Sequence, residues 1–138
     1  MEILIDNFRI GAGSPAFIVA ELSCNHLGDK DMAIETIRAA KTCGADAIKL
    51  QTYSPDTMTI DSDKDCFKIT NGSLWDGYTY YKLYKEAQTP WEWHDELFKV
   101  AREEGLICFS SPFDASSVDF LQQFNPPAYK IASFDISN

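Results

Sequence analysis

Residues 44–53 read Gly-Ala-Asp-Ala-Ile-Lys-Leu-Gln-Thr-Tyr, and they set the architecture of the chain. Their centre, residues 47–51, is apolar apart from one lysine and a final glutamine, which is typical of a strand buried on both faces. Gly44 is a natural end for a helix over residues 31–43, where apolar side chains recur at helical spacing. Another apolar run, Phe-Ile-Val-Ala, occupies residues 17–20. Strand, helix and strand at this spacing predict a βαβ unit with parallel strands.

Further βα units follow along the chain. Helices are predicted over residues 79–87 and from Thr89-Pro90 to about residue 104, because threonine suits the N-cap and proline the first helical turn. The segments that complete the pattern are a strand at 106–110, a helix at 115–124 and a fourth strand at 128–132.

Two segments fall outside this repeat. Residues 3–5 and 8–10 flank Asp-Asn and predict a short N-terminal β-hairpin. Residues 54–77 are long, rich in turn residues and weakly periodic, which is typical of a functional loop or an insertion.

Repeated βα units predict an α/β fold, either a TIM barrel or a doubly wound sheet. No glycine-rich phosphate fingerprint follows the first strand, which disfavours the dinucleotide-binding version of the sheet. A TIM barrel needs eight units and typically about 250 residues. The 138 residues therefore predict a partial (β/α) barrel, about the first four βα units preceded by the hairpin.

The composition excludes several classes of function. The formal net charge is -9, whereas nucleic acids and anionic membranes are bound through basic surfaces. The N-terminus lacks the features of a signal peptide, and no run approaches the roughly 20 apolar residues of a membrane span. The four cysteines form no C-x-x-C pair. These features predict a reducing, cytoplasmic location and no nucleic-acid or membrane partner.

Polar residues gather at the carboxyl end of each predicted strand, where a barrel carries its active site. A lysine inside an apolar strand is costly unless it meets an anion. Two such lysines on different strands predict a pocket for a phosphate or carboxylate, with serine hydroxyls as further donors. The strand-end residues are Glu21, Ser23, Lys49, Gln51, Ser110, Ser111, Lys130 and Ser133.

Plainer roles stay open for the same residues. Lys49 and Lys130 could extend to the surface, or Lys49 could pair with Glu21. Ser110 and Ser111 could be turn residues before a proline, and His26 a structural hydrogen-bonding group. The aromatic residues at helical spacing favour packing, whereas Trp75 lies in the insertion, where loops often cover substrate.

Four stretches, in order along the chain, resemble the sialic acid synthase family. They are residues 18–28, 44–53, 109–114 and 127–133. Within that family, residues 73–77 and 87–94 are most similar to the branch of pseudaminic acid synthases.

The resemblance implies condensation of phosphoenolpyruvate with a 2,4-diacetamido-2,4,6-trideoxy hexose, giving a nine-carbon sialic-type acid and phosphate. N-acetylmannosamine, the substrate of N-acetylneuraminate synthases, is an alternative. A divalent metal, Mn²⁺ or Mg²⁺, is implied, with ligands outside this chain. Residues 1–138 would be the N-terminal portion of the barrel domain of a homodimeric enzyme, without the rest of the barrel and the C-terminal antifreeze-like domain.

The resemblance also implies roles for individual residues. Glu21, Gln51 and Asp135 are the catalytic candidates, although many family members carry glutamate in place of Asp135. Asn25 and His26 are candidates for contacts to the sugar. The phosphoenolpyruvate candidates are Lys49, Ser110, Ser111, Lys130 and Ser133.

Two rival functions remain open at this point. The chain could be a non-catalytic fragment that binds an anion or a partner chain, because an open half-barrel exposes strand edges. It could also be a Schiff-base aldolase that uses Lys49 or Lys130.

Overall fold

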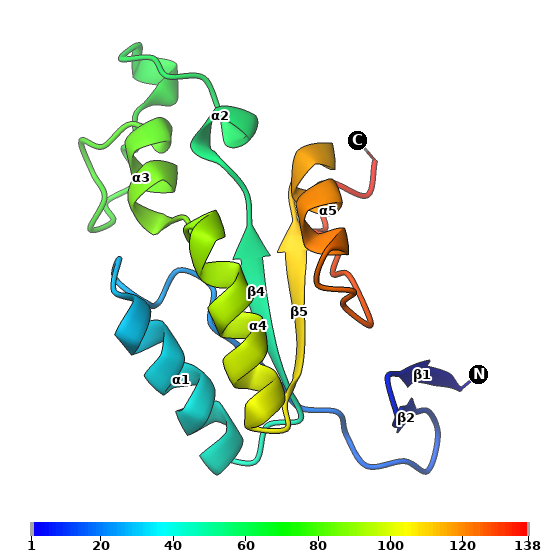
Figure 1. The fold of residues 1–138 in the computed structure, drawn as a ribbon. Coiled ribbons are helices and arrows are strands. Elements are labelled where there is room, and N and C mark those ends of the chain that lie inside the picture. Colours follow the sequence, from blue (N-terminus) through cyan, green and yellow to red (C-terminus); the bar gives the residue numbers. More distant parts are fainter. Residues whose placement is uncertain (1, 138) are drawn as a thin grey trace.

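The computed structural model of the chain describes residues 2–137, which form a small parallel sheet covered by helices (Figure 1). The sheet holds β3 (Val19–Glu21), β4 (Ala47–Thr52) and β5 (Ile107–Pro112), in the order β3-β4-β5. Both neighbouring pairs are parallel. The predicted α/β fold with parallel strands is therefore confirmed.

Helices α1 (Lys30–Thr42) and α4 (His94–Glu103) lie side by side over one face of the sheet (Figure 1). Helix α1 begins where the Asp29 carboxylate accepts hydrogen bonds from the backbone N–H groups of Asp31 and Met32. It ends before Gly44, whose φ of 87° suits the left-handed turn that terminates a helix.

The core lies between these helices and the sheet. Its fully buried side chains come from both layers, which removes apolar surface from water at roughly 25 cal/mol per Å². The largest are Leu22, Ile37, Ile48, Leu50, Leu97 and Leu121. Leu121 belongs to α5 (Ala115–Gln122), which begins at Asp114 through hydrogen bonds to Ser116 and Ser117.

The predicted hairpin is confirmed. β1 (Ile3–Ile5) and β2 (Phe8–Ile10) pair antiparallel, with Ile5 opposite Phe8. The hairpin lies apart from the parallel sheet, near the end where β4 and β5 begin (Figure 1).

The insertion projects beyond the opposite end of the sheet (Figure 1). It contains α2 (Pro55–Met58) and the 3-10 turn η1 (Asp65–Phe67), and α3 (Tyr80–Ala87) follows it. A single antiparallel bridge joins Lys68 to Thr79 and closes the loop between them.

The helix predicted from Pro90 to residue 104 is two elements, the 3-10 turn η2 (Trp91–Trp93) and α4. The prediction gave Thr89 a capping role, but its hydroxyl meets the His26 ring instead. The helical aromatics do pack, since Trp91 stacks on Phe120 at a centroid distance of 4.5 Å.

The predicted fourth strand at residues 128–132 is wrong as a full strand. It is reduced to one parallel bridge between Ser110 and Tyr129, with the Lys130 N–H donating to the Ser110 carbonyl at 3.1 Å. Pro126 and Pro127 precede it and have no N–H to donate to a ladder. These prolines limit pairing before residue 128, and after Lys130 the chain enters a turn in which the Asp135 N–H donates to the Ala132 carbonyl at 3.0 Å.

Candidate anion and sugar site

The strand register places four predicted site residues on one face of the sheet. Glu21 pairs with Lys49, and Gln51 pairs with Ser111. Side chains directly across a sheet share a face, and alternate residues of one strand do too. The bridge between Ser110 and Tyr129 puts Lys130 beside Ser111, on that same face.

Lys49 is buried and pairs with Glu21. Its ammonium lies 3.0 Å from the Glu21 carboxylate, and the two side chains are 8% and 59% exposed. The ion pair that the sequence left open as an alternative is therefore present. An ammonium has three N–H donors, so one carboxylate contact leaves capacity for an anion.

Ser111 has a hydroxyl that its surroundings do not explain. Its Oγ atom is buried, and no hydrogen-bond partner lies within reach among the described residues. A buried polar atom without a partner is destabilising, which makes a ligand at this position physically reasonable. The hydroxyl lies on the face that carries Lys49 and Lys130.

Ser110 lies on the opposite, helix-covered face. Its Oγ is 2.7 Å from Thr52 Oγ1, which is 2.8 Å from His94 Nε2. His94 Nδ1 lies 3.2 Å from the Pro90 carbonyl, which can only accept, so Nδ1 carries the proton and Nε2 accepts. Thr52 therefore donates to His94, and Ser110 donates to Thr52. The Ser110 proton is committed inside the fold, which favours a structural role over contact with phosphoenolpyruvate.

Both ring nitrogens of His26 also have partners within the fold. It is fully buried, its Nδ1 accepts from the Gly28 N–H at 3.1 Å, and its Nε2 lies 3.3 Å from Thr89 Oγ1. Burial lowers the pKa of His26 below its usual value. These contacts favour the structural role over a contact to sugar, and the neighbouring Asn25 makes a backbone turn to Leu22.

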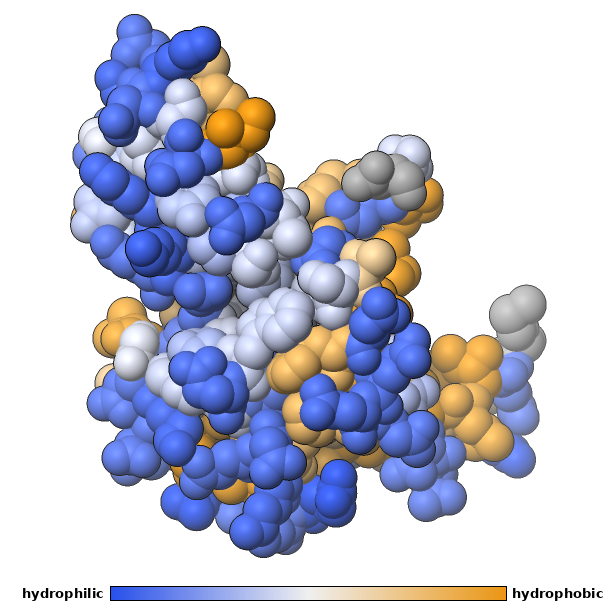
Figure 2. Space-filling model, turned by 45° about the horizontal axis from the view of Figure 1, so that its top comes forward, coloured by the Kyte–Doolittle hydropathy of each residue, from blue (hydrophilic) through white to orange (hydrophobic). Residues whose placement is uncertain are grey.

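A cavity of about 420 Å³ opens beside the strand ends. Three predicted residues, Gln51, Lys130 and Ser133, line it. Figure 2 shows the insertion as a projecting lobe, with a hollow between it and the C-terminal segment. Trp75, which the sequence placed in a loop of the kind that covers substrate, also lines it. The remaining lining was not predicted and is mostly apolar: Cys24, Tyr53, Met58, Leu83, Tyr84, Ala87, Phe113, Ala132 and Phe134.

Cys24 and Tyr53 support the polar side of this cavity. The Cys24 thiol donates to Gln51 Oε1 at 3.3 Å, and burial raises its pKa, so it stays protonated. The Tyr53 hydroxyl donates to the Tyr84 carbonyl at 3.3 Å, tying β4 to α3. Neither residue is among the site candidates predicted from the sequence.

Asp135 does not share the cavity of Gln51 and Lys130. It lines a separate cavity of about 310 Å³ with Asp114, Val118 and Ile131. Its Oδ2 atom is buried without a hydrogen-bond partner among the described residues. Asp135 therefore does not line the cavity that Gln51 lines.

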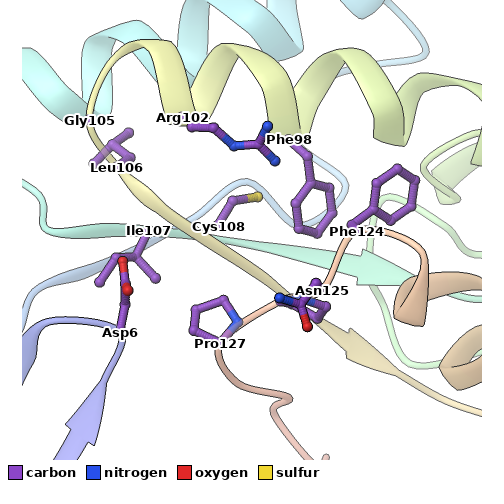
Figure 3. A pocket seen from close by; sticks show the side chains of 11 residues that line it. Asp6, Phe98, Arg102, Gly105, Leu106, Ile107, Cys108, Phe124, Asn125 and Pro127 are labelled. Atoms are coloured by element: carbon purple, nitrogen blue, oxygen red, sulfur yellow. The ribbon is translucent and has the colours of Figure 1, made fainter.

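A larger cavity of about 460 Å³ lies at the opposite end of the sheet, where β5 begins. Asp6 of the hairpin turn and Arg102 of α4 border it, with Asn125 across from them (Figure 3). The amino end of the strands in an α/β barrel serves stability, whereas the carboxyl end carries function. We therefore assign the candidate site to the cavity of about 420 Å³ beside Gln51 and Lys130.

Residues 2–137 bring together no group of three or more histidine, cysteine, aspartate or glutamate side chains that could hold a metal ion. The residues present do not provide a site for the divalent metal that the resemblance implies. None of the helices in this range combines the length and the apolar character needed to cross a membrane.

Comparison with known proteins adds three findings. The model of the NeuB family matches residues 36–138. The chain is 55% identical over 134 residues to a pseudaminic acid synthase of Campylobacter jejuni, covering 97% of this chain and 38% of that protein. It is 52% identical over 122 residues to a pseudaminic acid synthase of Helicobacter pylori, covering 88% of this chain and 36% of that protein.

A solved structure also matches the fold of this chain. The N-acetylneuraminic acid synthetase of Leptospira borgpetersenii, determined in complex with citrate, superposes with a TM-score of 0.82 and 28% identity. The match covers 100% of this chain and 43% of the other. The chain therefore spans less than half the length of the relatives it matches.

Proposed function

The chain belongs to the NeuB family, and on that premise we propose that it is the N-terminal, phosphoenolpyruvate-binding part of a pseudaminic acid synthase. The full-length enzyme would condense phosphoenolpyruvate with a 2,4-diacetamido-2,4,6-trideoxy hexose. The new carbon–carbon bond joins C3 of phosphoenolpyruvate to the sugar aldehyde carbon. One water is consumed and phosphate is released, leaving a nine-carbon acid.

One observation carries the proposal: Lys49, Gln51, Ser111 and Lys130 share a face at the carboxyl ends of parallel strands. Phosphoenolpyruvate presents a phosphate and a carboxylate on one small molecule. Two lysines, one on β4 and one next to the bridge at Tyr129, supply point charges for the two groups, and the unpartnered Ser111 hydroxyl supplies a further donor. Such donors stabilise the departing phosphate in a partly buried site.

The remaining candidates have subsidiary roles in this proposal. Glu21 holds the Lys49 ammonium at 3.0 Å and lies beside the bound anion. Gln51, whose carbonyl is held by Cys24, turns its amide nitrogen toward the substrate. Ser133 lines the cavity next to Lys130. Asp135 would act only if closure of the full protein brings it toward the site.

The whole enzyme would complete the barrel with residues outside this chain. Further βα units closing onto the exposed sheet edges would extend the three-stranded sheet to the eight strands of a TIM barrel. The divalent metal would take its ligands from those later units. We propose a homodimer in the cytoplasm.

Phosphate release tests the proposal. Residues 1–138 are joined to the remaining C-terminal part of the C. jejuni relative, with which they share 55% identity. The chimera should release phosphate from phosphoenolpyruvate only when the diacetamido hexose and Mn²⁺ are present, and mass spectrometry should detect the nine-carbon acid. Phosphate release that does not depend on the sugar would refute the synthase assignment.

A further inference from the structure

Building on the proposed function, we propose that Trp75 binds the methyl-bearing substituents of the sugar and sets the preference for a diacetamido, 6-deoxy hexose. This assigns a specificity role to the insertion.

The cavity has two chemically different sides. Gln51, Lys130 and Ser133 form the polar side, at the strand ends. Side chains from the insertion and α3, among them Met58, Trp75 and Leu83, form the apolar side. A ligand that fills the cavity must be charged or polar at one end and apolar at the other.

The proposed sugar has this character. Its acetamido groups and its C6 end in methyl groups, whereas N-acetylmannosamine carries hydroxyls at C4 and C6. Burying a hydroxyl against apolar side chains without a partner is unfavourable, while burying a methyl is favourable. The apolar side therefore favours the diacetamido hexose.

Trp75 is the largest of these apolar side chains, and its backbone is fixed before any ligand binds. The Asp76 carboxylate accepts hydrogen bonds from the N–H groups of Asn71, Gly72 and Ser73, which closes the loop on itself. The Trp75 ring packs edge-on against Tyr78 at a centroid distance of 5.4 Å.

The neighbouring Leu74 provides the contrast. Trp75 remains 39% exposed and borders the cavity, whereas Leu74 is 99% exposed and does not. An indole held in place at a cavity rim, with part of its surface still bare, can gain burial from a ligand. Leu74 does not line the cavity, so a ligand there would not bury it.

The test uses the same chimera and measures KM for each substrate. Trp75→Ala should raise KM for the diacetamido hexose about fifteenfold, as expected for two methyl contacts, at C4 and C6, of about fourfold each. KM for phosphoenolpyruvate and for N-acetylmannosamine should stay within about threefold, because phosphoenolpyruvate has no methyl group and N-acetylmannosamine carries hydroxyls at C4 and C6. Trp75→Phe should restore most of the affinity for the diacetamido hexose.

Leu74→Ala is the matched control and should leave every KM unchanged. Asp76→Ala, which frees the loop without touching the cavity, should raise KM for the diacetamido hexose in the same direction as Trp75→Ala. If Trp75→Ala changes KM for both sugars equally, or for neither, the specificity role is wrong and the synthase proposal stands. If the unsubstituted chimera releases no phosphate with either sugar, both proposals fail.

Discussion

Adjacent serines at the end of β5 have different surroundings because a strand turns successive side chains to opposite faces. Ser111 points to the face of Lys49 and keeps an unpartnered hydroxyl. Ser110 points to the helices and is hydrogen-bonded to Thr52. Sequence alone gave both residues the same candidate role, because they occupy the same strand end.

Substitution of each serine should separate the two roles. In the chimera, Ser111→Ala should raise KM for phosphoenolpyruvate about tenfold, since a hydrogen bond to a charged group contributes about 1.5 kcal/mol. Its thermal midpoint should not fall, because no hydrogen bond within the protein is lost.

Ser110→Ala should do the reverse, lowering the free energy of unfolding by about 1 kcal/mol while KM for phosphoenolpyruvate is unchanged. Urea unfolding of each variant, measured beside its kinetics, checks both expectations. A loss of phosphoenolpyruvate affinity in Ser110→Ala equal to that in Ser111→Ala would overturn the assignment of faces.

At the scale of elements, α4 is joined to the sheet by a buried hydrogen-bond network as well as by apolar packing. His94 is fully buried at the first turn of α4 and accepts from Thr52 of β4. Burial lowers the pKa of His94 to about 4, from an ordinary value of 6.5. The folded state therefore holds the neutral ring, while the unfolded state takes up a proton as the pH falls.

This difference predicts a loss of stability in acid. The contribution of His94 is fully present above pH 6.5 and is lost as the pH falls toward 4. Between pH 7 and pH 5, protonation of His94 in the unfolded state should lower the free energy of unfolding by about 2 kcal/mol. In His94→Gln, the free energy of unfolding should fall by about 2 kcal/mol less between these two pH values.

Urea unfolding of the chain and of His94→Gln at both pH values measures the effect. His26, whose pKa burial also lowers, is present in both proteins and cancels in the comparison. An identical pH dependence in the two proteins would show that His94 does not carry the effect.

The elements that sequence predicted well are those whose signals are local. The hairpin, the apolar strands and the helix ended by Gly44 follow from turn residues and hydrophobic period. The prediction of a fourth strand was wrong because an apolar run indicates only burial, whereas a strand also needs hydrogen-bond partners along its length. Apart from Trp75, the apolar side of the cavity was missed because tertiary packing gathers it from segments distant in sequence, Met58, Leu83 and Phe134 among them.

In the molecule as a whole, a group of apolar side chains is exposed in the C-terminal segment, which follows the last strand of the sheet. Ile131, Phe134 and Ile136 are all more than half exposed, and they lie in the segment that follows the bridge at Tyr129. The relatives it matches continue well beyond this length, since the chain covers 38% of the C. jejuni protein. Apolar surface of this kind promotes association between chains.

We therefore expect the isolated 138-residue chain to self-associate as its concentration rises. Ile136→Lys should weaken that association by placing a charge in the exposed apolar segment. Leu74→Lys is the control, because Leu74 is 99% exposed but lies on the insertion, outside the C-terminal segment. Sedimentation velocity over a range of concentrations checks this, and a chain that stays monomeric throughout would contradict it.

Calorimetric titration of phosphoenolpyruvate into the chain shows whether the carboxyl ends of these strands form an anion site. Lys49→Met removes the buried ammonium, and Lys99→Met is the matched control, because Lys99 also pairs with a glutamate but on the outer surface of α4. We predict saturable one-site binding in the chain and in Lys99→Met, and no measurable binding in Lys49→Met. Equal binding in Lys49→Met, or none in the unsubstituted chain, would contradict the account.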